Sequence, residues 1–124
     1  MSMPKQLIHI VPIAFYDEFR IGDLYDPRNR TSFGNNAPYI HTTPSIEQLT
    51  SHLSYFEKMK PSEFYLLKIT TDDIDEDNIT HCTENGRTYH HLWCSLRRDQ
   101  YELLLATKNE RGELEISPLR ESLY

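Results

Sequence analysis

The dipeptide Asn85-Gly86 constrains the fold of this chain most, because Asn-Gly is the pair that a two-residue β-hairpin turn favours. It separates two segments of strand length, residues 79–83 and 87–93. A second hairpin is predicted where residues 101–107 and 113–117 flank the tetrapeptide Asn-Glu-Arg-Gly. The carboxyl-terminal part of the chain is therefore expected to form antiparallel β-structure.

The amino-terminal part is expected to begin as a strand and continue as a helix. Residues 7–11 are an apolar run of strand length that ends at Pro12. His9 lies on an apolar face of this strand, so it is either a core histidine bonded to the backbone or the floor of a ligand site. Apolar residues at helical spacing then predict a first helical segment that ends near Gly22. These residues are Ile13, Tyr16 and Phe19.

A second helical segment is predicted from Pro44 onwards. Thr43 is a favourable N-cap, and Pro44 suits the first helical position. Just before it, Tyr39 and His41 share one face of a short extended segment. The N-terminus of a helix offers N–H donors and partial positive charge, so this is a candidate site for a small polar or anionic ligand. The apolar positions of the helix are Ile46, Leu49, Leu53 and Phe56.

The order of the predicted elements indicates the fold class. Residues 64–70 are a further strand, so the chain reads as one strand, two helical segments and then mostly strands. This order is typical of an α+β fold with an antiparallel, split β-sheet and two main helical segments. At 124 residues, with no internal repeat or linker, the chain is expected to be a single domain, 1–124.

Charge and composition exclude several classes of protein. The net charge of −6 argues against general nucleic-acid binding and against adhesion to an anionic membrane, which both need surplus Lys and Arg. No cleavable signal or membrane span is visible in the sequence. Two cysteines without an export signal are expected to be reduced thiols, which favours the cytoplasm.

The polar segment from Arg28 to Pro38 is long for a loop between two elements. One interpretation is an insertion without function. The other is a lid that carries Arg28 and Arg30 over Tyr39 and His41. The sequence alone does not choose between them.

Metal and thiol chemistry are less well supported. Cysteine and histidine are the ligands that zinc prefers, but the spacing of this set matches no familiar zinc motif. His90 and His91 also point to opposite faces of one strand. No metal site is expected. A cysteine nucleophile is less favoured still, because no basic cluster or helix start adjoins either cysteine in the sequence. The set considered is Cys82, His90, His91 and Cys94.

Three histidines on predicted strands, accompanied by aromatic residues, are the strongest functional signal. Rings stack on flat heterocycles, and imidazoles form hydrogen bonds with hydroxyl or phosphate groups. The histidines are His9, His41 and His91, and the aromatic residues are Tyr39, Tyr89 and Trp93.

Five short motifs resemble, in order and spacing, the small bacterial family called DUF952. They are His9-Ile10-Val11, residues 22–25 with Pro27, Tyr39-Ile40-His41, residues 64–69, and residues 89–93 with Leu96. The resemblance implies a fold similar to the ADP-ribosyltransferase and RNA 2'-phosphotransferase superfamily, with NAD as a cofactor or substrate. The chain departs from the family pattern at Tyr39, His90, Trp93 and Cys94.

The resemblance also implies roles for individual residues. His9 would hold the adenosine side of NAD, and Tyr39 with His41 would pack against the nicotinamide. His91 matches the histidine of the last motif, so His41 and His91 are the candidate catalytic residues. Arg28 and Arg30 are candidates for binding phosphate. Glu84 is only a weak candidate for the catalytic glutamate that many ADP-ribosyltransferases need.

Three functions therefore remain open from the sequence. The first is binding of NAD, ADP-ribose or a related nucleotide, with or without transfer of an ADP-ribosyl or phosphate group. The second is a non-catalytic binding or regulatory module whose histidines are structural. The third is a protein stabilised by zinc.

Overall fold

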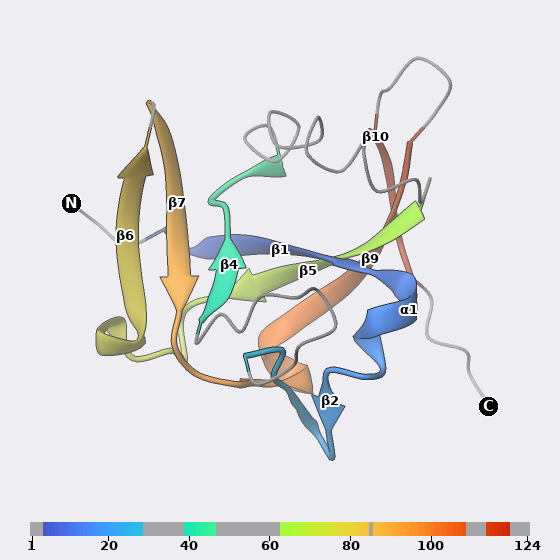
Figure 1. Ribbon diagram of the computed structural model, residues 1–124, viewed down its shortest axis with the longest axis horizontal. Helices are drawn as coiled ribbons and strands as arrows, with labels where there is room; N and C mark the ends of the chain where they lie inside the picture. The colour runs from blue at the N-terminus through green and yellow to red at the C-terminus, as the bar shows by residue number, and fades with distance from the viewer. Residues whose placement is uncertain (1–3, 29–38, 47–62, 85, 109–113, 120–124) are drawn as a thin grey trace.

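The computed structural model describes residues 4–28, 39–46, 63–84, 86–108 and 114–119 (Figure 1). Its strands are β1 (Gln6–Pro12), β2 (Arg20–Ile21), β3 (Leu24–Tyr25), β4 (Ile40–Thr42), β5 (Glu63–Thr70), β6 (Ile79–Glu84), β7 (Arg87–Leu92), β8 (Leu96–Arg97), β9 (Tyr101–Lys108) and β10 (Leu114–Pro118). The helical elements whose bounds lie within the described residues are α1 (Ile13–Tyr16) and two 3-10 turns, η1 (Glu76–Asn78) and η2 (Arg98–Gln100).

These strands form three sheets in which every pairing is antiparallel. The main sheet has the order β1-β5-β9-β10. The second sheet is β2-β3-β8, and the third is β4-β7-β6. In Figure 1 the hairpin of β6 and β7 runs across the direction of β1 and β5, with β4 beside β7.

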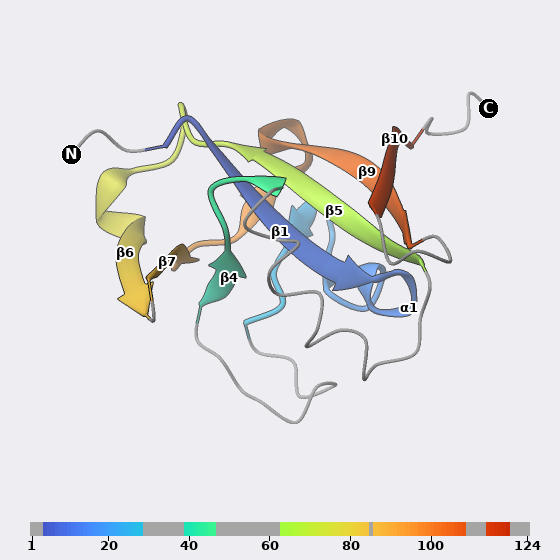
Figure 2. The ribbon, with the colours of Figure 1, turned by 90° about the horizontal axis from the view of Figure 1, so that it is seen from above.

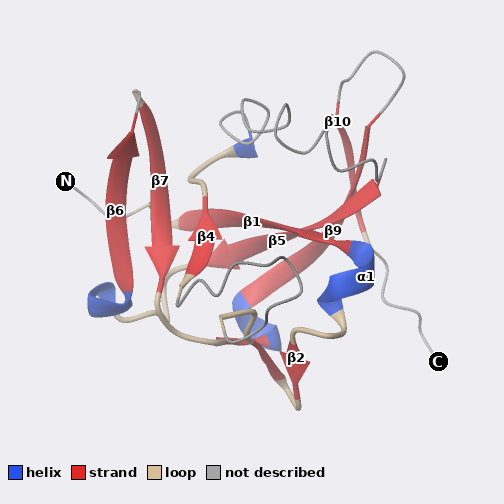
Figure 3. Ribbon diagram, viewed as in Figure 1, coloured by secondary structure: helices blue, strands red, loops and turns tan. Residues whose placement is uncertain are grey.

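The predicted α+β class with two main helical segments, and the ADP-ribosyltransferase-like arrangement with it, is wrong. The protein is mostly β-structure in the part that the structure describes (Figure 3). The first predicted helix is only the four residues of α1. Of the second, all but residues 44–46 lies outside the described residues.

The first helix was overestimated because a turn satisfies the same apolar spacing. Tyr16 and Phe19 are both buried, but Phe19 reaches the core from a turn after α1. Gly22 has a φ of 60°, a conformation that favours glycine, and it lies in the tight turn between β2 and β3. It therefore reverses the chain between two strands instead of ending a helix.

The predicted strands and hairpins are confirmed. The first predicted strand is β1, and the predicted strand 64–70 lies within β5. The two hairpin predictions correspond to the pairs β6–β7 and β9–β10. In the main sheet β5 lies between β1 and β9, with His9 opposite Leu67 and Leu67 opposite Leu103.

Both faces of the main sheet carry buried apolar side chains, which explains why β5 reads as a nearly continuous hydrophobic run. The smaller cluster is Ile8, Leu66, Leu104 and Ala106. The larger cluster includes Leu7, Val11, Tyr16, Phe19, Tyr25, Ile40, Leu67, Ile69, Leu92, Leu96, Tyr101 and Leu103. It joins side chains from all three sheets and is the main core.

Tyr25 lies in this core and is fully buried. Its ring centroid is 5.7 Å from that of Tyr16, 6.1 Å from that of Tyr101 and 5.6 Å from that of His9. Tyr16 and Tyr101 join their hydroxyl groups in a hydrogen bond of 2.7 Å. A core with this many tyrosines needs a partner for each buried hydroxyl, and these contacts supply them.

Strand β4 connects the main sheet to the third sheet. At its carboxyl end Thr43 forms two backbone hydrogen bonds with Ile8 of β1, of 2.7 and 2.8 Å. Along its length it pairs with β7, so that His41 lies opposite His91. Figure 2 shows β4 beside β1 from above. Strand β4, which carries His41 and follows Tyr39, is therefore held by backbone hydrogen bonds to both β1 and β7.

Tyr25→Phe is expected to destabilise the protein by about 1–3 kcal/mol, because it removes a buried hydroxyl that is hydrogen-bonded to His9 at 2.9 Å. Urea denaturation measures the change. Tyr89→Phe is the matched control, because it removes a hydrogen bond of the same length at the surface, to Glu84. Equal effects of the two substitutions would contradict the role assigned to Tyr25.

Candidate functional site

The third sheet has one buried face and one outer face. On the inner side, Ile40 and Thr42 of β4 and His90 and Leu92 of β7 are all buried. Alternation along the two strands turns the intervening side chains outward. These outward residues, with Tyr39 and Trp93 at the ends of the two strands, are the aromatic face: Tyr39, His41, Tyr89, His91 and Trp93.

Three of these rings form a stacked group. The rings of Tyr39 and His91 are nearly parallel, at 14°, with centroids 3.6 Å apart. Trp93 meets the ring of Tyr39 edge-on, with a centroid distance of 5.4 Å. Its indole Nε1 donates to Thr80 Oγ1 at 2.7 Å, which fixes the orientation of the ring. Trp93 remains 39% exposed, so an ordered aromatic surface faces the solvent.

At the other end of the aromatic face the rings lie farther apart and are not parallel. His41 lies 5.1 Å from Tyr89 and 5.8 Å from His91 between ring centroids, and these rings are tilted. Tyr89 donates its hydroxyl hydrogen to Glu84 Oε2 at 2.9 Å, and this hydrogen bond raises the pKa of Tyr89. Glu84, the weak candidate for a catalytic glutamate, is therefore a partner of Tyr89. The candidate catalytic residues His41 and His91 lie on the same face of the sheet.

The stacked group carries no positive charge at neutral pH. Partial burial lowers the pKa of His91, so its imidazole is neutral at pH 7. Tyr39 and Trp93 are uncharged. This surface therefore suits a flat, weakly polar ring better than a cluster of phosphate groups.

Cys82 is a residue that the sequence reasoning set aside. It lies on β6 directly opposite Tyr89, so its side chain is on the same side of the sheet as His91. Its Sγ atom is 3.6 Å from His91 Nδ1. The basic neighbour of Cys82 in the sequence is His81, which lies on the other side of the sheet, but the register of the β6–β7 hairpin brings the imidazole of His91 to it. Counting outward from that turn would have found this pair.

His9 is a partly buried, hydrogen-bonded residue and is not part of the aromatic face. Its Nδ1 lies 2.8 Å from the carbonyl oxygen of His41, which can only accept, so Nδ1 carries the hydrogen. Nε2 must then accept from the Tyr25 hydroxyl, 2.9 Å away. Burial lowers the pKa of His9 to about 4, and the imidazole is neutral. Both nitrogens are thus used to join β1 to β4 and β3.

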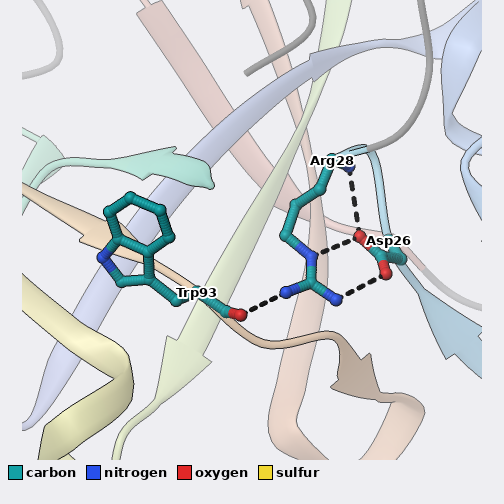
Figure 4. A network of polar contacts seen from close by, with 3 residues as sticks. All are labelled: Asp26, Arg28 and Trp93. Carbon is teal, nitrogen blue, oxygen red and sulfur yellow. Dashed lines mark hydrogen bonds and ion pairs between the residues drawn. The ribbon is translucent and has the colours of Figure 1, made fainter. Parts of the chain in front are cut away.

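Arg28 forms a bidentate ion pair with Asp26 (Figure 4). Its Nε donates to Oδ1 and its Nη2 to Oδ2, both at 2.8 Å, and its backbone N–H donates to Oδ1 at 3.1 Å. Nη1 donates to the backbone carbonyl oxygen of Trp93. This guanidinium therefore holds the chain after β3 against the end of β7. Arg30 and the rest of the predicted lid lie outside the described residues.

His90 lies on the opposite side of β7 from His91, as predicted, and is only 3% exposed. Its Nε2 is 3.2 Å from Nδ1 of His81, and burial lowers its pKa. Within the part of the chain that the structure describes, no group of three or more His, Cys, Asp or Glu side chains could hold a metal ion. Cys82 and Cys94 are free cysteines.

Comparisons with protein-family models, with curated proteins and with solved structures find no match to this chain. Among the helices of the described residues, none has the length and apolar character needed to cross a membrane. What the protein does must therefore be argued from the aromatic face and its surroundings.

Proposed function

We propose that the protein binds a planar heteroaromatic ring on the aromatic face, as the base of a small nucleotide such as NAD, ADP-ribose or a related compound. The observation that carries the proposal is the nearly parallel stack of Tyr39 on His91, next to Trp93, which is 39% exposed. Stacking of a base on an aromatic side chain contributes about 1–3 kcal/mol to binding. Fixed side chains add to this, because little conformational entropy is lost when the ligand binds.

The lack of charge on the stacked group predicts that adenosine binds nearly as tightly as NAD. Tyr39, His91 and Trp93 are neutral at pH 7, and the guanidinium of Arg28 is held by Asp26 and by the Trp93 carbonyl group. Recognition is therefore assigned to the base and its sugar, and the phosphates contribute less. Binding of phosphate by Arg30 and transfer of an ADP-ribosyl or phosphate group by His41 and His91 stay predictions, as does membership of the DUF952 family. A cytoplasmic location likewise stays a prediction from the sequence.

Adenosine and NAD are expected to bind and to quench the fluorescence of Trp93, the single tryptophan of the chain. His91→Ala is expected to weaken binding by about 1–3 kcal/mol, because it removes one partner of the stack. Fluorescence titration and calorimetry measure both quantities, and thermal unfolding checks that the variant is folded. Adenosine is expected to bind nearly as tightly as NAD.

His81→Ala is the matched control for this experiment. His81 is an exposed histidine of the same hairpin, but it lies opposite His90 on the other side of the sheet. The proposal fails if folded wild-type protein binds neither compound, or if His81→Ala weakens binding as much as His91→Ala. Nicotinamide release, followed in the same samples by chromatography, tests turnover separately. Release that His41→Ala abolishes would add glycosyl transfer to binding.

A further inference from the structure

A cavity lies outside the aromatic face, between α1 and the strands β5 and β9. Its volume is about 410 Å³, within the range of small-molecule sites. None of the five residues of the aromatic face lines it. The lining residues are Ile13, Tyr16, Asp17, Arg20, Tyr65, Arg98, Leu103 and Leu119.

Five of the eight lining residues are apolar or aromatic, and the other three are charged. Tyr16 and Tyr65 meet edge to face, with ring centroids 5.5 Å apart and an angle of 90°. Leu103 is buried beneath them. A hydrocarbon or aromatic body packed here would be removed from water, which favours binding.

Two arginines converge on one pair of tyrosines at this cavity. The guanidinium carbon of Arg20 is 5.8 Å from the ring centroid of Tyr16, and that of Arg98 is 4.9 Å from the ring centroid of Tyr101. Tyr16 and Tyr101 are joined through their hydroxyl groups at 2.7 Å. Burial raises the pKa of Tyr101, whereas the charges of Arg98 and Arg20 both act to lower it. Arg98 Nη1 also donates to the backbone carbonyl oxygen of Tyr101 at 2.8 Å. Both guanidinium groups therefore lie close to the joined pair of Tyr16 and Tyr101.

The residues that line the cavity carry a net positive charge although the whole chain is acidic. The charged residues among them are two arginines and Asp17, which gives +2 − 1 = +1, in a chain of net charge −6. Asp17 is 88% exposed and lies 4.0 Å from Arg20, which is 45% exposed. An ion pair this long and this exposed is weak, so Asp17 competes poorly with an anionic ligand.

We propose that this cavity binds an organic anion, in which Arg20 and Arg98 hold a carboxylate or phosphate group and the walls of Tyr16, Tyr65 and Leu103 hold an apolar body. Guanidinium groups bind such oxygen anions through charge-assisted, paired hydrogen bonds. The apolar walls give selectivity for an anion with an aromatic or aliphatic body over a free inorganic ion. This site is independent of the nucleotide site proposed on the aromatic face.

Phenyl phosphate and benzoate, with benzyl alcohol as the neutral probe of similar shape, test the site by calorimetry and by NMR titration. At least one of the two anions is expected to bind about tenfold or more tightly than benzyl alcohol, because charge-assisted hydrogen bonds dominate. Arg20→Gln and Arg98→Gln are each expected to weaken anion binding by about tenfold. Adenosine is not expected to compete, so failure of the nucleotide proposal would leave this result unaffected.

Arg97→Gln is the matched control, because Arg97 adjoins Arg98 but pairs with Asp99 at the surface and does not line the cavity. It is expected to leave anion binding unchanged. Arg98→Lys keeps the positive charge but removes the paired N–H donors of the guanidinium group. Thermal unfolding shows whether each variant is folded. Equal binding of benzyl alcohol and the anions, no binding of any probe, or an effect of Arg97→Gln equal to that of Arg20→Gln would each overturn the proposal.

Discussion

Between pH 7 and pH 4 the protein is expected to lose up to about 3 kcal/mol of its free energy of unfolding through one histidine, His9. Its pKa is about 4 in the folded protein and about 6.5 in the unfolded chain. Above pH 6.5 the imidazole is neutral in both states, so the full stability is present. As the pH falls from 6.5 to 4, the unfolded chain takes up a proton that the folded protein does not, and the folded state loses its advantage.

The structural cause is the pair of hydrogen bonds that His9 makes. Protonation would put a hydrogen on Nε2, which accepts from the Tyr25 hydroxyl in the folded protein. His90 and His91 also have lowered pKa values, so they act in the same direction. Because part of the His9 ring is exposed, the value of about 3 kcal/mol is an upper limit. It is still a large share of the stability of a typical domain.

Chemical denaturation of the wild type and of His9→Asn at a series of pH values measures this effect. The asparagine amide can keep an N–H donor near the position of Nδ1, but it does not titrate. His9→Asn is expected to be less stable at pH 7 and to lose less stability than the wild type on acidification. Two curves that run parallel from pH 7 to pH 4 would show that His9 does not carry the pH dependence.

Arg28→Met is expected to destabilise the protein by about 2 kcal/mol or more, because it removes the guanidinium from a largely buried carboxylate. The Asp26 side chain is 12% exposed and that of Arg28 is 24% exposed, so water screens the pair poorly. Asp26→Asn combined with Arg28→Met is expected to cost less than the sum of the two single changes, since neither charge is then left without its partner. The difference between the sum of the two single effects and the effect of the double substitution is the coupling energy of the pair.

The surface pair of Arg97 and Asp99 is the matched control for this double-mutant cycle. It joins the same two residue types at the same separation in the chain, with N and O 3.1 Å apart, but its side chains are 55% and 72% exposed. Its coupling energy is expected to be below about 1 kcal/mol. Equal coupling at the two pairs would contradict the importance of burial. Arg28→Met is also expected to alter the fluorescence of Trp93, whose carbonyl group Arg28 binds.

The strands were predictable because their signals are local. Asn85-Gly86 permits a tight turn, and the flanking residues pair outward from it, from Glu84 with Arg87 to Ile79 with Leu92. The apolar runs of β1 and β5 have the length and composition of buried strands, and this signal does not depend on which strands they pair with. The first helix was not predictable by the same reasoning. Side chains three residues apart can point into the same side of a core from a helix or from a turn. Their spacing in the sequence does not distinguish the helix from the turn.

The aromatic face was predictable in part. Alternation along β7 placed Tyr89, His91 and Trp93 together, and the motif at Tyr39 and His41 indicated a second strand of the site. That β4 pairs with β7, so that His41 lies opposite His91, depends on a contact between residues far apart in the chain. The separation of His9 and Arg28 from this face has the same origin. Their hydrogen-bond partners come from other strands and from the chain after β3.

The strands, the two hairpins and the sharing of a strand face follow from the sequence alone, because they depend on neighbours within a few residues. The long-range packing sets three other features: the fold is mostly β, His9 is neutral and partly buried, and Arg28 is paired with Asp26. Burial shifts the pKa of a histidine, and long-range contacts select the partner of an arginine. Both effects arise only when the sheets have packed. The approach of Arg20 to Tyr16 and of Arg98 to Tyr101 likewise depends on contacts between residues from different elements.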